Sequence, residues 1–185
     1  ARGSLKDLKK IIIKVGNANY PTILPLGSGN TRFYNTPTFY PAAPTVFATN
    51  ALLDFTNNAT ETVISTINTA VLVAGTWVNQ HSARMTVTPT GRVTFNPTSS
   101  EDLSVTVSAT LLTASGNNQI TLQIAKNGVL IANAAASVTG SATTSRDIEI
   151  SWNDSFDTGD YIELFAINET DTANLTITSA TLRVG

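Results

Sequence analysis

The sequence contains no cysteine, one histidine and one methionine, and only 13% of its 185 residues are charged. Without cysteine, thiol nucleophiles and zinc sites built on thiolates are excluded. A Ser–His–Asp triad would have to use His81, but no GxSxG motif or comparable strand–turn–helix context surrounds that residue. We therefore predict no catalytic residues, no metal site and no cofactor, and we expect a protein that is not an enzyme.

Long hydrophobic runs are also missing. The apolar stretches are far shorter than the roughly 20 residues that a helix needs to span a bilayer, so we expect no membrane contact. A secretory signal peptide is not expected either, because its apolar core covers about 7 to 15 residues and only Ile11–Ile13 are contiguous here. Apolar residues make up 42% of the chain. With so few charges, part of the surface is expected to be covered by partner molecules.

Charge is distributed unevenly along the chain. Residues 1–14 carry five basic side chains and one acid, a net charge of +4, whereas residues 46–185 carry five basic side chains and twelve acids, a net charge of −7. A basic tail on an acidic body typically docks on an acidic protein surface or on nucleic acid, although such a run also solubilises a terminus. The acidic body lacks the clustered Lys and Arg that phosphate contacts need, so we expect no nucleic-acid binding by it.

The first residues of the chain fit two local structures. In one, Ser4 caps a short helix and the lysines face away from an apolar stripe. That stripe would consist of Leu5, Leu8, Ile12 and Val15. In the other, Lys10–Val15 is an extended segment that adds to a neighbour's sheet. The sequence does not distinguish between the two.

Residues 16–45 are rich in proline and aromatic side chains. Five of the seven prolines lie here, which disfavours a regular helix or a central strand and predicts an extended arm. Disorder is disfavoured because disordered linkers are poor in aromatic residues. We expect the aromatic side chains to pack on the chain's own body or, preferably, on another molecule, and we place the domain boundary after residue 45. The predicted docking residues of the arm are Lys6, Lys9, Lys10, Lys14, Tyr20, Phe33, Tyr34, Phe39 and Tyr40.

From about residue 60 the sequence is typical of consecutive short strands. Each candidate strand carries β-branched or aromatic residues and is bounded by Gly, Pro, Asn, Asp or Ser clusters. The predicted strands are Glu61–Ile67, Ala70–Val78, Ala83–Thr88, Gly91–Phe95, Leu103–Ala114, Gln119–Lys126, Val129–Ser137, Arg146–Trp152, Asp160–Asn168 and Asn174–Val184. About ten short strands with tight turns predict an all-β, antiparallel jelly-roll sandwich over residues 46–185.

The clearest local signal is a hairpin centred on Asn127-Gly128. An Asn-Gly pair supplies the two positive φ angles of a type I′ turn, whose twist matches that of the flanking strands. The turn fixes the register of the preceding strand. Ile120, Leu122 and Ile124 should therefore share one face of the sheet.

Several motifs resemble a known fold family. Lys126–Gly128 (KNG) and, about thirty residues later, Asp157–Leu164 (DTGDYIEL) are similar to the KNG and GD-x-[VI]-x-L motifs of C1q/TNF-like jelly rolls. Gly91–Phe95 and Leu103–Ala109 resemble earlier strands of that family. Thr56–Ile64 resembles the segment that leads into such a head in phage virion proteins. The resemblance implies a trimer with both termini near its base.

An acidic loop offers a candidate cation site. Asp154, Asp157 and Asp160 recur at three-residue spacing, and calcium favours such oxygen clusters. The register of an EF-hand loop is absent, however. A solvated loop between strands is therefore the preferred interpretation.

Aromatic side chains offer a candidate glycan site. Trp152 ends an alternating apolar run and is predicted to lie in the core. Trp77 lies beside a polar loop. It could join Tyr20, Tyr34 and Tyr40 in a platform on which a sugar stacks.

Together these observations predict a structural virion protein on the capsid surface. In this interpretation a homotrimeric jelly roll decorates or cements a phage capsid, and residues 1–45 clamp the major capsid protein. Extended arms add reach, and three arms on one trimer add avidity. The alternative is the receptor-binding tip of a phage tail or head fibre, in which the loops of the sandwich hold a host glycan.

Overall fold

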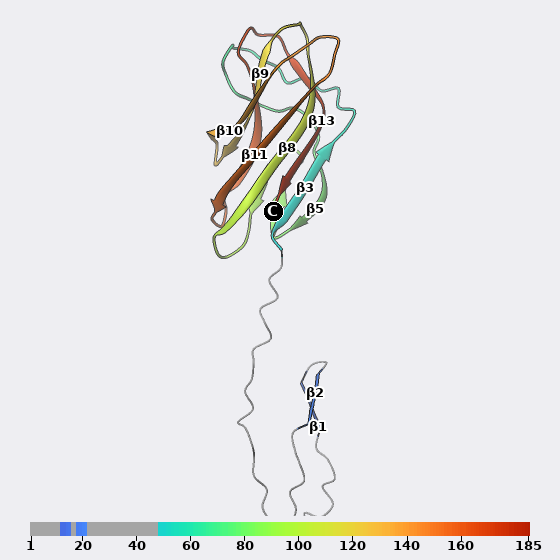
Figure 1. Cartoon of the computed structure of the whole chain (residues 1–185), viewed down its shortest axis with the longest axis vertical. Coiled ribbons are helices and arrows are strands. Elements are labelled where there is room, and N and C mark those ends of the chain that lie inside the picture. The colour runs from blue at the N-terminus through green and yellow to red at the C-terminus, as the bar shows by residue number, and fades with distance from the viewer. Residues whose placement is uncertain (1–11, 16–17, 22–47) are drawn as a thin grey trace, which may run out of the picture. The chain divides into compact units, whose positions relative to one another are not determined.

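The computed structural model describes residues 12–15, 18–21 and 48–185. The chain divides into two units, residues 1–45 and 46–185. Figure 1 shows the second unit as two layers of antiparallel strands.

The first unit contains a two-stranded antiparallel sheet. Strand β1 (Ile12–Val15) pairs with β2 (Ala18–Pro21), and Ile12 lies opposite Pro21. The helical interpretation of the N-terminal stretch is therefore wrong for Ile12–Val15. Pro21 is accommodated because both strands of a two-stranded sheet are edge strands, which tolerate the missing N–H.

The described part of the second unit consists of eleven strands. They are β3 (Asn50–Phe55), β4 (Val71–Leu72), β5 (Val78–Ala83), β6 (Met85–Val87), β7 (Val93–Phe95), β8 (Glu101–Thr113), β9 (Gln119–Lys126), β10 (Val129–Thr139), β11 (Arg146–Phe156), β12 (Tyr161–Asn168) and β13 (Leu175–Val184). The five-stranded sheet has the order β11-β8-β13-β3-β5, and the six-stranded sheet has the order β10-β9-β12-β7-β6 with β4 paired to β12.

The strand order is that of a jelly roll. The connections from β7 to β8, β8 to β9, β10 to β11, β11 to β12 and β12 to β13 each cross from one sheet to the other, while β9 and β10 form a hairpin within one sheet. Such crossings wrap the chain around a single core. The predicted all-β, antiparallel jelly-roll sandwich is confirmed.

Two predicted strands near the start of the sandwich are wrong or shortened. Glu61–Ile67 is not a strand; Thr62 forms an isolated bridge with Leu175. The β-branched residues of Glu61–Ile67 lie in the connection between β3 and β4 and do not pair along a strand. Ala70–Val78 contributes only the two-residue strand β4. Strands β3 and β5, which lie side by side at the edge of the five-stranded sheet, were not predicted.

The core lies between the two sheets. It is formed by alternating side chains of both, including the fully buried Leu53, Val105, Val107, Leu111, Ile120, Leu122, Ile124, Ile162, Ile177 and Leu182. The prediction that Ile120, Leu122 and Ile124 share one face of the sheet is thus confirmed. Trp152 is also in the core, as predicted, where its ring lies edge-on to Phe156 at 5.9 Å.

The two ends of the sandwich chain meet at one end of the sandwich, which we call the base. Ala51 near the start of β3 is the partner of Val184 at the end of β13. Gly185 exchanges two backbone hydrogen bonds with Ser104. The Asn127-Gly128 turn also lies at this end, with φ angles of 54° and 77° that confirm the predicted hairpin turn.

Candidate interaction surface

The outward side of the five-stranded sheet, here called the open face, carries side chains in register across all five strands. One row contains Ser151, Thr106, Arg183, Leu52 and His81, which are successive partners on β11, β8, β13, β3 and β5. The next row contains Glu149, Ser108, Thr181, Asp54 and Val78. Most of these side chains are short, so the backbone comes close to the surface over the middle of the sheet.

Two opposite charges on the open face lack partners. Arg183 and Glu149 are exposed, and neither side chain forms a hydrogen bond or ion pair within the part of the chain that the structure describes. Asp54 differs, because it accepts a hydrogen bond from Gln80 at 2.8 Å. The central rows therefore carry one cation and one anion without a side-chain partner, together with the Asp54 carboxylate, whose partner is neutral.

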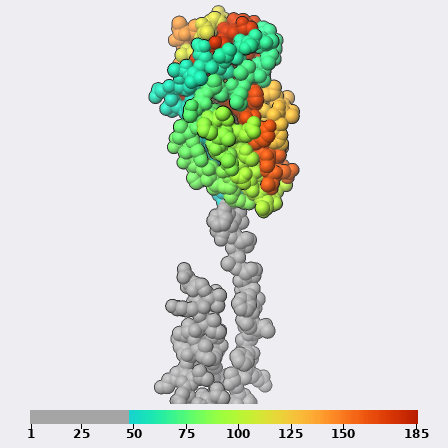
Figure 2. All heavy atoms as spheres, turned by 180° about the vertical axis from the view of Figure 1, so that it is seen from behind, coloured from blue at the N-terminus to red at the C-terminus, as the bar shows by residue number. Residues whose placement is uncertain are grey.

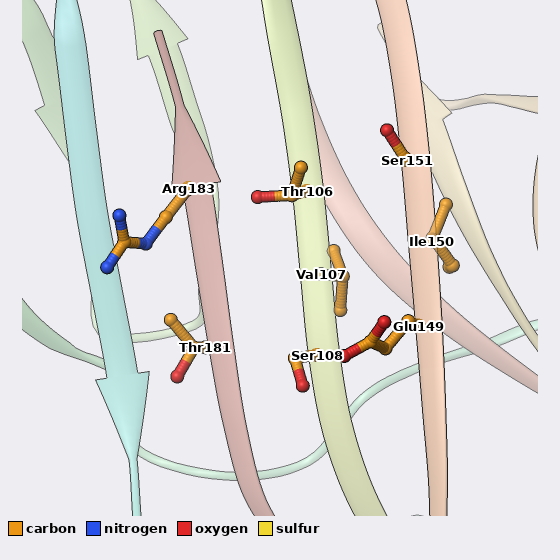
Figure 3. A pocket seen from close by; sticks show the side chains of 8 residues that line it. All are labelled: Thr106, Val107, Ser108, Glu149, Ile150, Ser151, Thr181 and Arg183. Atoms are coloured by element: carbon orange, nitrogen blue, oxygen red, sulfur yellow. The ribbon is translucent and has the colours of Figure 1, made fainter.

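Shallow hollows lie on both sides of Arg183. One, of about 320 Å³, lies over β11, β8 and β13, where short hydroxyl side chains stand between Glu149 and Arg183 (Figure 3). The other, of about 510 Å³, extends from Arg183 past Asn50 to His81. The carbonyl oxygen of the Asn50 side chain is buried there without a hydrogen-bond partner. The open face is thus shaped to receive protruding groups.

The outward side of the six-stranded sheet is buried in its middle instead. Its side chains Thr121, Ala125 and Glu163 are 6%, 0% and 7% exposed. Glu163 is held by Arg92 at 3.0 Å, and the Arg92 guanidinium lies 4.1 Å from the ring centre of Tyr161. Figure 2 shows the teal and green segments of the chain spread over this side. The middle of the six-stranded sheet is therefore buried on its outward side at Thr121, Ala125 and Glu163, whereas Ala135 and Ser137 on its edge strand β10 are exposed.

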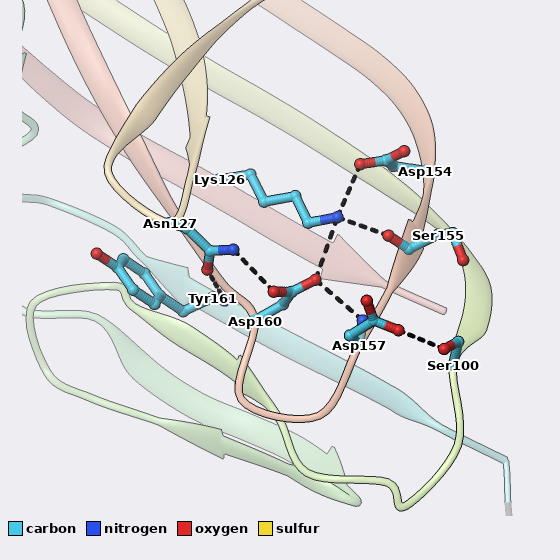
Figure 4. Close-up of polar contacts among 8 residues, drawn as sticks. All are labelled: Ser100, Lys126, Asn127, Asp154, Ser155, Asp157, Asp160 and Tyr161. Carbon is cyan, nitrogen blue, oxygen red and sulfur yellow. Dashed lines mark hydrogen bonds and ion pairs between the residues drawn. The ribbon is translucent and has the colours of Figure 1, made fainter.

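A second polar group, the base cluster, joins three segments at the base: Ser100, Lys126, Asn127, Asp154, Asp157 and Asp160 (Figure 4). The Lys126 ammonium lies 2.9 Å from Asp154 and 3.2 Å from Asp160 and also donates to the Ser155 carbonyl. Ser100 donates to Asp157. The acidic triplet considered as a calcium site is thus split: an ammonium lies between two of its carboxylates, and the third faces a hydroxyl.

The electrostatics of the base cluster follow from these contacts. Burial alone would raise the pKa of Asp160, but hydrogen bonds from Asn127, the Asp157 N–H and Lys126 outweigh it and hold that pKa below its ordinary value of 3.8. Burial alone would lower the pKa of Lys126, but the two carboxylates raise it above 10.5. Both groups are therefore charged at neutral pH.

The tryptophans do not form a glycan platform. Trp77 is 4% exposed and packs edge-on against Phe55 with ring centres 4.6 Å apart, and Trp152 is 7% exposed. Interpreting Trp77 as a surface aromatic is wrong, because the loop carrying Gly91 covers it. Its tyrosine companions lie in the first unit, where Tyr20 is part of β2 and Tyr34 and Tyr40 lie outside the described residues.

The predicted docking residues belong to the first unit. Lys14 lies in β1 opposite Asn19, and Tyr20 lies in β2 opposite Ile13. The others, Lys6, Lys9, Lys10, Phe33, Tyr34, Phe39 and Tyr40, lie outside the described residues.

The described residues offer neither a membrane-spanning helix nor a metal-binding cluster. No helix there is long and apolar enough to cross a bilayer. The same residues contain no group of three or more His, Cys, Asp or Glu side chains that could hold a metal ion.

The open face was not predicted from the sequence. Its signal was present in the outward-pointing alternation Thr106/Ser108, Glu149/Ser151 and Thr181/Arg183. These pairs are separated by dozens of residues, so only the pairing of the strands shows that they form one surface.

Comparison with known proteins shows similarity in fold. No family model matches the sequence, and no curated protein matches it. Similar solved structures include Eiger TNF from S. frugiperda (14% identity, TM-score 0.46, 74% of this chain and 92% of that chain). Murine APRIL at pH 5.0 (11%, 0.48, 73% and 98%) and PRD1 vertex protein P5 (11%, 0.47, 74% and 94%) are also similar. These matches describe the arrangement of strands, and no residue role is transferred from them.

Proposed function

We propose that this chain is a structural virion protein: a homotrimer that decorates a capsid, with residues 1–45 docking on the major capsid protein. The observation that carries the proposal is the open face. Its central side chains are short, and its two central unpaired charges have opposite signs. A second copy of the chain is the partner that fits such a surface, because it carries the complementary charge itself.

The dimensions of the open face suit self-association. The five strands of the open face are 6 to 13 residues long, and at about 4.8 Å between strands and about 3.3 Å per residue they give a surface of roughly 700 Å². A standard interface takes about 800 Å² from each partner. In a trimer, each copy would divide this surface and the flanking strand edges between two neighbours.

The charges favour a closed ring. Glu149 lies on β11, at the edge of the sheet, and Arg183 lies on β13, in its middle. One copy can be rotated so that its β11 edge lies over β13 of the next copy. This rotation brings Glu149 of the first copy to Arg183 of the second. Repeated around a threefold axis, the same contact pairs Glu149 of each copy with Arg183 of the next.

The first unit supplies the capsid contact in this proposal. Its +4 terminus is complementary to an acidic surface, and the sandwich itself is acidic, so the arm rather than the sandwich is suited to that contact. We assign the chain no catalytic activity. His81 is exposed on β5 and has no hydrogen-bonded acid or hydroxyl among the described residues.

Charge reversal tests the self-association. Sedimentation of the full-length chain at micromolar concentration should give a trimer. Arg183→Glu and Glu149→Arg should each dissociate it, because a buried unpaired charge costs about 2–5 kcal/mol, and the double reversal should restore it. Arg146→Glu, an equal charge change at the far end of β11, is the control. A monomeric parent refutes the trimer, whereas unaffected single reversals refute only this interface.

Capsid occupancy tests the docking. Replacing Lys6, Lys9, Lys10 and Lys14 by Gln should lower the occupancy of purified capsids and weaken its salt dependence, with Arg146→Gln as the control. If the lysine-free chain decorates capsids like the parent, the clamp is refuted. If it also binds host cells as the parent does, the receptor-binding alternative takes its place.

A further inference from the structure

The turn at the base contains a reactive pair of residues. Asn127-Gly128 is the single Asn-Gly pair of the sequence, and both residues are exposed to water. Glycine has no side chain to hinder its own backbone nitrogen, which is the nucleophile in asparagine deamidation. The Gly128 N–H forms no hydrogen bond within the described residues, so this nitrogen is not tied up in the turn.

The reaction needs only water. The Gly128 nitrogen attacks the side-chain carbonyl carbon of Asn127, the new C–N bond closes a succinimide, and the amide nitrogen leaves as ammonia with the proton from Gly128. Water then opens the ring at either carbonyl to give aspartate or isoaspartate. No oxidant, reductant or cofactor enters the balance.

The fold holds the Asn127 side chain by both of its polar atoms. Its amide nitrogen donates to Asp160 at 2.7 Å, and its oxygen accepts from the Tyr161 N–H at 3.0 Å. The Asn127 N–H donates to the Tyr161 carbonyl at 2.9 Å. Figure 4 shows the side chain directed at the start of β12. Turning the amide carbon towards Gly128 breaks both side-chain hydrogen bonds.

We propose that Asn127 is a site of spontaneous modification to aspartate or isoaspartate, and that Asp160 sets its rate by restraining the amide. Asp160 is suited to this because its carboxylate is fixed from three sides. Lys126 lies 3.2 Å away, the Asp157 N–H donates to it at 2.9 Å, and Asn127 is the third contact. A fixed, charged acceptor makes a stronger hydrogen bond than a mobile neutral one.

The modification would replace the hydrogen bond between positions 127 and 160 of the base cluster by repulsion between two carboxylates. An aspartate at position 127 has no amide to donate, and its carboxylate faces Asp160 where a hydrogen bond of 2.7 Å existed. Lys126 on β9 is the cation of the cluster, and Asp154 on β11 with Asp157 in the following loop adds further negative charge. The tip of the β9–β10 hairpin would therefore lose its side-chain hydrogen bond to Asp160, while the backbone hydrogen bond from the residue 127 N–H to the Tyr161 carbonyl remains.

The rate of deamidation tests the restraint. The full-length chain is incubated at neutral pH, and the Asn127 peptide is followed by mass spectrometry. Asp160→Ala should deamidate about tenfold faster than the parent, since a hydrogen bond to a charged group is lost. Asp157→Ala removes a carboxylate of the same loop that does not touch Asn127 and should match the parent. In urea all three should react at one fast rate.

Two results overturn the proposal: equal rates for the parent and Asp160→Ala, or a native parent as fast as the urea-unfolded chain. If Asp160→Ala does not fold, Asp160→Asn replaces it. This variant keeps an acceptor without charge and should react at an intermediate rate, and a rate equal to the parent's again overturns the proposal.

The product is tested separately with Asn127→Asp. At neutral pH this variant should melt about 2–4 °C below the parent. The difference should shrink as the pH falls below the ordinary carboxyl range and protonation removes the repulsion among positions 127, 154, 157 and 160. A difference that is independent of pH would show that the carboxylate is not repelled.

Discussion

A substitution at Gly91 tests the contact between the turn before β7 and the buried Trp77. Gly91 is buried in this turn, with φ at +85°. A Cβ added there would lie 2.4 Å from Nε1 and 2.6 Å from Cδ1 of Trp77. Trp77 has little room to move, because it is buried and packs against Phe55 with ring centres 4.6 Å apart. Gly91→Ala is therefore expected to disturb both the turn and the aromatic pair.

The magnitude follows from two separate costs. An L-residue in the left-handed region costs about 1–2 kcal/mol, and overpacking a well-filled site adds about 1–3 kcal/mol. Gly91→Ala should therefore lower the free energy of unfolding by about 2–5 kcal/mol. Gly159 isolates the first cost, since its φ is +91° and an added Cβ meets nothing within 4 Å. Gly159→Ala should lose only about 1–2 kcal/mol.

Urea unfolding followed by far-UV circular dichroism measures both variants without depending on the displaced tryptophan. Near-UV circular dichroism then shows whether the environment of Trp77 has changed in Gly91→Ala and not in Gly159→Ala. Equal losses of stability in the two variants would refute the predicted contact between Gly91 and Trp77. Gly116→Ala, with neither a left-handed φ nor a close neighbour, should match the parent.

Three further outcomes are expected. Gly128→Val should lose about 1–2 kcal/mol in urea unfolding, because a β-branched residue resists its φ of +77°; if it melts like Gly116→Val, the turn is misassigned. Asn168 is fully buried and makes four hydrogen bonds in the turn after β12, so Asn168→Ala should lose about 2–4 kcal/mol, and a loss within about 0.5 kcal/mol would contradict this role. Asp160→Asn should be less stable than the parent by about 1 kcal/mol at neutral pH, because the lowered pKa of Asp160 stabilises the fold above pH 3.8. That difference should vanish as the pH falls through the lowered pKa, and melting curves across the acid range check it.

The strands with sustained alternation could be predicted from the sequence. In β9 the apolar residues Ile120, Leu122 and Ile124 recur at every second position and are fully buried, and Asn127-Gly128 supplies the turn that its φ angles confirm. The period of two fixes which side chains share a face. Strands β3 and β5 were not predicted. The sequence of β5, VNQHSA, is mostly polar and gives no apolar alternation.

The surface was decided by the tertiary structure. Arg183, Thr106 and Ser151 are neighbours because β13 pairs with β8 and β8 with β11, and the packing of the whole core sets that register. The tertiary structure also placed the Lys126 ammonium between Asp154 and Asp160 and buried Trp77 beneath the turn at Gly91. Local sequence determined the strands and the inward face of each, since alternation depends only on neighbouring residues. The open face and the base cluster depend on residues far apart in the chain, so only folding could bring them together.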